Sequence, residues 1–134
     1  MWKFICDSGT EKECLSRQLF GNSKMVDEIE EGDLLFLHNR ESDRLMGPFE
    51  AATDSTMRIV EHAWDGRFPF QVYVTWSEPV YELPVGEVSD PSITENPISL
   101  PIRDKFQALS EEQAERFLTA LENHEKSQKI ICKR

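Results

Sequence analysis

Alternation of apolar and polar positions predicts strands through the first two thirds of the chain. Large side chains alternate along Trp2–Cys6, and residues 70–76 carry a second alternating run. Residues 34–38 are almost continuously apolar and follow a Glu-Gly-Asp turn, which is typical of a buried strand. After a polar stretch at 39–43, residues 44–52 read as the returning strand of a hairpin.

The returning strand contains a proline, which breaks an otherwise regular pattern. Simple alternation places Leu45, Gly47, Phe49 and Ala51 on one face. Because Pro48 has no backbone N–H to donate, it predicts either an edge strand or a bulge at this point.

Capping boxes predict the starts of two helices. Thr10 with Glu13 opens a helix that carries apolar residues at helical spacing and stops at Gly21. Ser110 with Gln113 opens a second helix, whose core face holds Phe117, Leu118 and Leu121.

Weaker patterns complete the predicted elements. Met25, Val26 and Ile29 suggest a short additional helix, and residues 129–132 suggest a final strand. Residues 82–102 hold four of the seven prolines, which predicts a long and mostly irregular connection. Helices near the two ends and strands with short connections between them indicate an α+β domain with a curled sheet.

Length and composition place this α+β chain among globular proteins. With 134 residues, 39% hydrophobic and 30% charged, we expect residues 1–134 to form a single domain. No run of about 18 apolar residues occurs, so we expect no membrane segment and a cytoplasmic protein. Cys6, Cys14 and Cys132 are an odd number at scattered positions, as expected for reduced thiols.

The chemical groups do not point to an enzyme. Phosphate-binding loops, nucleophile elbows and His-Glu-x-x-His helices are absent from the sequence, and His38, His62 and His124 lie at unrelated positions. The acids at 27–33 fit a solvated face better than a metal site. We therefore expect a non-catalytic protein with no cofactor and no metal.

Residues 63–70 form the most unusual segment of the chain. Trp64 and Arg67 lie around a glycine and a proline just before a predicted strand. An exposed indole at a strand end could stack on a nucleic-acid base, a contact worth about 1–3 kcal/mol. The alternative is that Trp64 is a lid that closes the hydrophobic core, which is the commoner role for a single tryptophan.

Four blocks of the sequence resemble the successive blocks of the DCD (development and cell death) domain, in the same order. They are residues 13–21 (ECLSRQLFG), 32–39 (GDLLFLHN), 45–51 (LMGPFEA), and Trp64 with 67–72 (RFPFQV). The resemblance covers residues 3–84. It implies a PUA-like α+β fold, of the EVE/YTH type, with a curled, largely antiparallel, barrel-like sheet and flanking helices.

A weaker resemblance to YTH domains implies binding of RNA or of a modified nucleotide. It implies that Phe20 and Trp64 stack the base, that Asn22 contacts the base edge, and that Arg103, with Arg67 as a further candidate, holds a phosphate. The pattern departs from YTH domains, because the cage position before Trp64 holds Ile59 or Val60 and is not aromatic.

Charge bears on the choice between two classes of partner. In YTH domains the loop after the first strand carries a lysine where this chain has Asp7, and a carboxylate beside a phosphate weakens RNA binding. The net charge of −10 also opposes binding of nucleic acid by bulk electrostatics. The alternative function is therefore the DCD-type protein-interaction module linked to stress responses, with a protein partner.

Overall fold

The computed structural model describes residues 1–23, 28–57, 59–60, 63–77, 79–85, 102 and 105–130. The elements in chain order are β1 (Trp2–Cys6), α1 (Ser8–Ser16), β2 (Leu19–Asn22), β3 (Leu34–Asn39), β4 (Arg44–Ala51), β5 (Thr56–Met57), a 3-10 turn (Ala63–Gly66), β6 (Phe70–Thr75), β7 (Val80–Pro84), β8 (Gln107–Ala108), α2 (Glu111–Asn123) and β9 (Gln128–Ile130).

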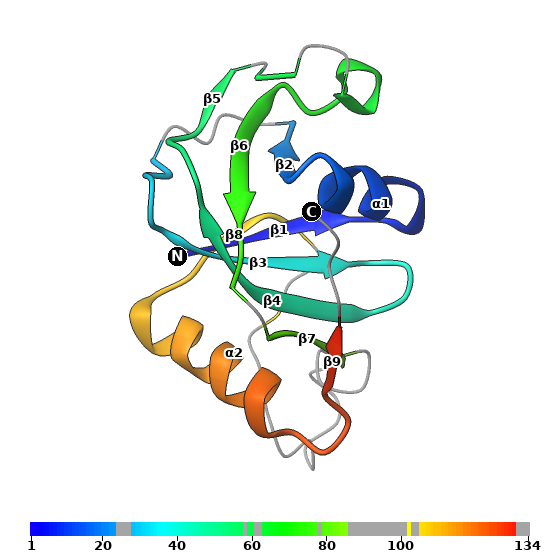
Figure 1. Cartoon of the computed structure of the whole chain (residues 1–134), viewed down its shortest axis with the longest axis vertical. Coiled ribbons are helices and arrows are strands. Elements are labelled where there is room, and N and C mark those ends of the chain that lie inside the picture. The colour runs from blue at the N-terminus through cyan, green and yellow to red at the C-terminus, as the bar shows by residue number, and fades with distance from the viewer. Residues whose placement is uncertain are drawn as a thin grey trace.

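The nine strands form one curled sheet, a half-barrel (Figure 1). Its main path runs β2-β6-β4-β3-β1-β8, while β5 pairs with β6 and β7 joins β4 to β9. The β1–β3 pair is parallel, and the other pairings among the described strands are antiparallel. The predicted α+β class with a curled, largely antiparallel sheet is confirmed.

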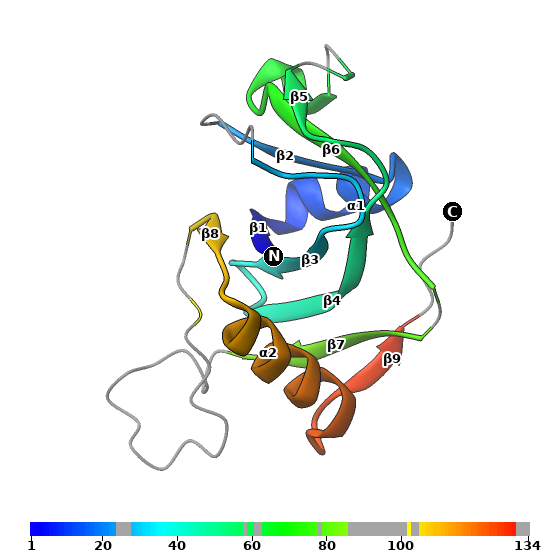
Figure 2. The ribbon, with the colours of Figure 1, turned by 90° about the vertical axis from the view of Figure 1, so that its left-hand side faces the viewer.

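The curl places β2 and β6 across from β1, β3 and β4, and separates two hydrophobic clusters (Figure 2). The inner cluster lies inside the half-barrel and includes Phe4, Phe20, Leu35, Leu37, Phe49, Trp64, Val72, Val74 and Trp76. The outer cluster lies between the sheet and α2 and includes Phe36, Leu45, Leu83, Val85, Ala114, Phe117 and Leu121. Strand β3 is apolar on both faces because it contributes to both clusters.

A bulge in β4 corrects the predicted face of that strand. Leu37 pairs with Met46 whereas Leu35 pairs with Phe49, so β4 holds one residue more than β3 between these pairs. As a result Leu45 belongs to the outer cluster and Phe49 to the inner one, although simple alternation places them on one face. The bulge that Pro48 predicted is confirmed.

Helix α1 begins earlier and ends earlier than predicted. Its N-cap is Asp7, whose Oδ1 accepts a hydrogen bond from the Thr10 amide at 2.9 Å, and Thr10 occupies the N3 position of the capping box. The segment after it is strand β2 and not a helix end, because pairing with β6 outweighs the helical spacing. Helix α2 has the predicted Ser110–Gln113 capping box.

The remaining predictions have mixed outcomes. Strand β7 runs from Val80 to Pro84 and so extends into the predicted irregular connection, since β4 and β9 supply partners on both of its edges. The final strand is confirmed as β9. Residues 25 and 26 of the predicted short helix lie outside the described residues, and Ile29 is not helical.

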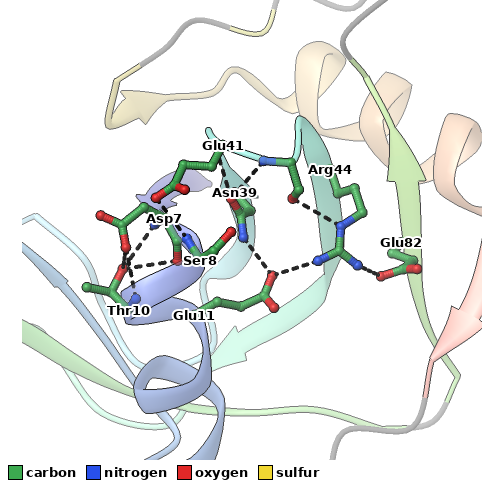
Figure 3. Close-up of polar contacts among 9 residues, drawn as sticks. Asp7, Ser8, Thr10, Glu11, Asn39, Glu41, Arg44 and Glu82 are labelled. Atoms are coloured by element: carbon green, nitrogen blue, oxygen red, sulfur yellow. Dashed lines mark hydrogen bonds and ion pairs between the residues drawn. The ribbon is translucent and has the colours of Figure 1, made fainter.

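An ion-pair network ties α1 to the β3–β4 hairpin and to β7 (Figure 3). The Arg44 guanidinium donates to Glu82 and, at 3.3 Å, to Glu11. Asn39 is fully buried and donates from Nδ2 to the same Glu11 carboxylate at 3.1 Å. The network holds the first turn of α1 against the end of the hairpin.

Neither described helix is long and apolar enough to span a membrane.

Candidate functional site

A cleft of about 460 Å³ opens beside β1, β2 and the start of α1. Its lining residues come from segments far apart in the sequence: Ile5, Cys6, Asp7, Thr10, Gly21, Asn22, Ser23, Arg40, Phe68, Lys105 and Phe106. A volume in this range suits a small organic ligand or one unit of a polymer.

Among the described residues, two strand edges beside the cleft have no partner strand. There β8 pairs with β1 at Trp2 and Lys3, so β1 continues beyond this pairing toward Ile5. The Arg40 amide donates to the Cys6 carbonyl at 2.9 Å, which turns the main chain of Cys6 toward β3. Since main-chain groups alternate along a strand, Ile5 presents its N–H and C=O to the side of the cleft.

Strand β2 forms the opposite edge in the same way. The Val74 amide donates to the Gln18 carbonyl at 2.8 Å, and the register then turns Phe20 and Asn22 toward β6. The main chain of Gly21 consequently points away from β6, to the side of the cleft. The cleft is thus bounded by main-chain donors and acceptors as well as by side chains.

Among the described residues, two cations and one acid line this cleft. Arg40 lies in the turn after β3, and Lys105 lies just before β8. The side chain of Lys3 is 0% exposed and donates from Nζ to the Lys105 carbonyl at 3.0 Å, which anchors the 105–106 segment to β1. Asp7 brings a carboxylate from the N-cap of α1.

Aromatic rings form the apolar part of the cleft lining. Phe106 stacks on Trp2 with ring centres 5.7 Å apart and planes at 16°, and it meets the edge of Phe4 at 4.9 Å. Phe68 packs edge-on against Trp64 at 5.6 Å. The Arg67 guanidinium lies over the Phe68 ring, 5.5 Å from its centre.

Trp64 lies behind the cleft wall and not in it. The residue is 3% exposed, and a Cβ added at Gly21 would lie 2.6 Å from the Trp64 ring. Its amide donates to Glu13 of α1 at 3.2 Å, and its positive φ of 51° turns the chain so that the ring faces inward. Trp64 therefore lies as a lid on the hydrophobic core, which is the alternative role that the sequence offers for it.

A buried glutamine fixes the loop that carries Trp64. Gln71 is 1% exposed, accepts from the Val60 amide at 2.7 Å, and donates to the carbonyls of Val60 and Phe68 at 3.1 and 3.0 Å. These three bonds satisfy main-chain groups of Val60 and Phe68 and hold both residues beside β6.

The thiols near the cleft are not activated. Burial, together with the neighbouring Glu13 carboxylate, raises the pKa of Cys14 to about 12. Burial, together with the Cys14 sulfur and nearby acids, also raises the pKa of Cys6 far above its usual range. Both are therefore thiols and poor nucleophiles at neutral pH.

The five predicted site residues are distributed unevenly. Asn22 lines the cleft. Phe20 is 0% exposed, packed against Phe4 and Phe49, so neither it nor Trp64 presents an open face in this structure. Arg67 is exposed beside the cleft wall and donates from Nε to the Trp64 carbonyl at 3.2 Å. Arg103 lies outside the described residues.

Sequence reasoning missed Arg40, Lys105 and Phe106. Arg40 occupies a polar hairpin turn, where a solvated cation is the ordinary case, and residues 105–106 come after the proline-rich stretch. Of the cleft residues, Asn22 did give a signal, through its resemblance to an asparagine of YTH domains that contacts the base edge.

Together, the fold and the cleft describe an α+β half-barrel domain with an open cleft beside β1 and β2. The family model of the development and cell death domain matches residues 2–125. The chain belongs to this family.

Plant proteins are among its relatives. The chain is 39% identical over 82 residues to the carrot (Daucus carota) B2 protein, and 39% and 38% identical over 82 residues to the soybean (Glycine max) DCD domain-containing proteins NRP-B and NRP-A. Each match covers 53% of this chain but only 40%, 25% and 22% of the respective relative. The match thus spans well under half the length of these relatives.

Proposed function

We propose that residues 1–134 act as a cytoplasmic, single-domain RNA reader, which binds one unpaired nucleotide, plain or modified, in the cleft without catalysis. The observation that carries the proposal is the composition of the cleft lining. Two cations, an amide and two phenylalanine rings converge there from four separate segments, although the molecule as a whole is acidic.

Each group has a counterpart in a nucleotide. Arg40 and Lys105 hold phosphate oxygens, since guanidinium and ammonium groups make most phosphate contacts. Asn22 offers both a donor and an acceptor to a base edge, and Phe106 offers an aromatic surface for stacking. Phe20 and Trp64 support the wall from behind and do not stack on the base themselves.

The absence of an activated nucleophile supports binding without catalysis. Cys6 is the thiol that lines the cleft, and burial holds its pKa far above neutrality. A reader needs affinity and selectivity alone, which the cleft groups provide.

The test is a fluorescence titration with single-stranded RNA oligonucleotides, with and without N6-methyladenosine, at two salt concentrations. Binding beside Phe106 is expected to change the emission of Trp2, which stacks on that ring. Asn22→Ala is expected to lower affinity about tenfold, as loss of a buried hydrogen-bonding group does. Arg40→Ala is expected to reduce the slope of log affinity against log salt by about one.

The matched control is Arg116→Ala, which removes an exposed cation from α2. If the control lowers the salt slope as much as Arg40→Ala does, the proposed phosphate site is wrong. If no oligonucleotide binds even at low salt, RNA reading is wrong altogether.

A protein-interaction function is the second candidate, and one observation favours it. The solvent face of α2 exposes Glu111, Glu112, Glu115 and Glu122, in a molecule of net charge −10. Such a face suits a basic protein partner better than a phosphate backbone. Absence of RNA binding would make this the leading function.

A further inference from the structure

Asp7 is the one carboxylate among the described residues that line the cleft. Its Oδ1 atom accepts from the amide and the hydroxyl of Thr10 at 2.9 and 3.1 Å, as Figure 3 shows. Its own amide donates to the Thr10 hydroxyl at 3.0 Å. The described residues supply no hydrogen-bond donor to Oδ2.

The capping box therefore holds the Asp7 carboxylate in place before any ligand arrives. One oxygen is used by α1, and the other is an acceptor without a protein partner in the described part of the chain. A preorganised acceptor costs little ordering entropy on binding, so its hydrogen bond contributes more fully to affinity.

Asp7 also gives the cleft two regions of opposite charge. Arg40 and Lys105 attract an anionic group, whereas Asp7 repels it and accepts from a neutral donor. A phosphate is thus held away from the start of α1, and the ligand group next to Asp7 must carry a hydrogen to donate.

We propose that Asp7 accepts a hydrogen bond from the ribose 2′-hydroxyl of the bound nucleotide and so makes the cleft selective for RNA over DNA. This inference rests on the proposed function. A carboxylate is a common partner for ribose hydroxyls in nucleotide sites, and the 2′-hydroxyl is the group that distinguishes RNA from DNA at a given position. Asp7, which opposes phosphate binding, thereby makes the cleft prefer ribose to deoxyribose.

The experiment compares an oligoribonucleotide with the oligodeoxyribonucleotide of the same sequence, using wild-type protein and the variant Asp7→Asn. Asparagine is as good an N-cap as aspartate, so α1 keeps its start while the ionic acceptor is lost. We expect wild type to prefer RNA by about tenfold, the usual effect of one hydrogen bond to a charged group. Asp7→Asn is expected to bring the RNA-to-DNA affinity ratio close to one.

The matched control is Glu41→Gln. Glu41 is an exposed acid at the same helix start, where its Oε1 accepts from the Ser8 amide at 3.3 Å, but it does not line the cleft. It should therefore leave the RNA-to-DNA ratio at the wild-type value. A urea titration checks that both variants are folded.

The outcomes separate the two proposals. Equal wild-type affinity for RNA and DNA overturns the role of Asp7 and leaves RNA reading in place. An unchanged ratio in Asp7→Asn overturns it too. Failure of both oligonucleotides to bind overturns the proposed function itself.

Discussion

The inner and outer clusters both bury apolar side chains against the sheet, but they do so with different kinds of neighbours. The outer cluster is an amphipathic helix laid on a sheet, with Phe117 edge-on to Phe36 at 5.2 Å. The inner cluster instead has a buried polar side chain beside it, Gln71, which bonds to Val60 and Phe68. Such a polar group must be hydrogen-bonded inside the protein, which demands specific geometry.

The difference shows where the fold accommodates a site. A helix on a sheet needs only apolar residues at the right spacing. The inner cluster lies under the open edges of β1 and β2, and positive φ angles at Trp64 and Asp65 shape its lid. Strained backbone is commonest at functional sites, which agrees with the location of the cleft.

The largest expected effect tests both clusters with one kind of truncation. Trp64→Ala and Phe117→Ala should each lower the free energy of unfolding by about 3–5 kcal/mol, because both rings are buried. Only Trp64→Ala should also weaken RNA binding, since Gly21 and Phe68 lose the ring that supports them. Urea unfolding and titration of the folded protein measure the two effects. Near-wild-type stability of Trp64→Ala would show that the ring is not a core lid.

A smaller effect is expected from adding one methyl group to either cluster. Gly21→Ala places a Cβ 2.6 Å from the Trp64 ring, and Gly47→Ala places one 2.8 Å from the Phe36 ring. Each overpacked site should cost about 1–3 kcal/mol. Gly21→Ala should in addition shift tryptophan emission and RNA affinity, whereas Gly47→Ala should change stability alone. Equal emission spectra for the two variants would contradict the position of Trp64.

The smallest effect concerns the two helix starts. Ser110→Ala and Asp7→Ala should each cost about 0.5–2 kcal/mol, because a helix amide loses its capping acceptor. Thr10→Ala should cost less than Asp7→Ala, since the Thr10 amide keeps its acceptor on Asp7. Urea midpoints rank the three variants. A larger loss of stability for Thr10→Ala than for Asp7→Ala would show that Thr10, and not Asp7, is the N-cap.

Local patterns determined the elements that depend on local physics. Alternation located Trp2–Cys6 and β6, a two-sided apolar run located β3, and the Ser110–Gln113 box located the start of α2. Pairing across the sheet overrode the helical spacing around Leu19, and no local signal showed that Gln71 would be buried. Such positions depend on partners distant in sequence.

The sequence by itself determined the α+β class and the resemblance to the family that its family model confirms. Tertiary structure alone decided the site. It turned Trp64 inward, brought Arg40 and Lys105 beside Asn22, and left β1 and β2 unpaired along one seam. The physical reason is that the exposure of a side chain depends on which residues the curled sheet packs against it. The curl of the sheet brings together residues that are far apart in sequence, and their separation in sequence does not predict their distance in space.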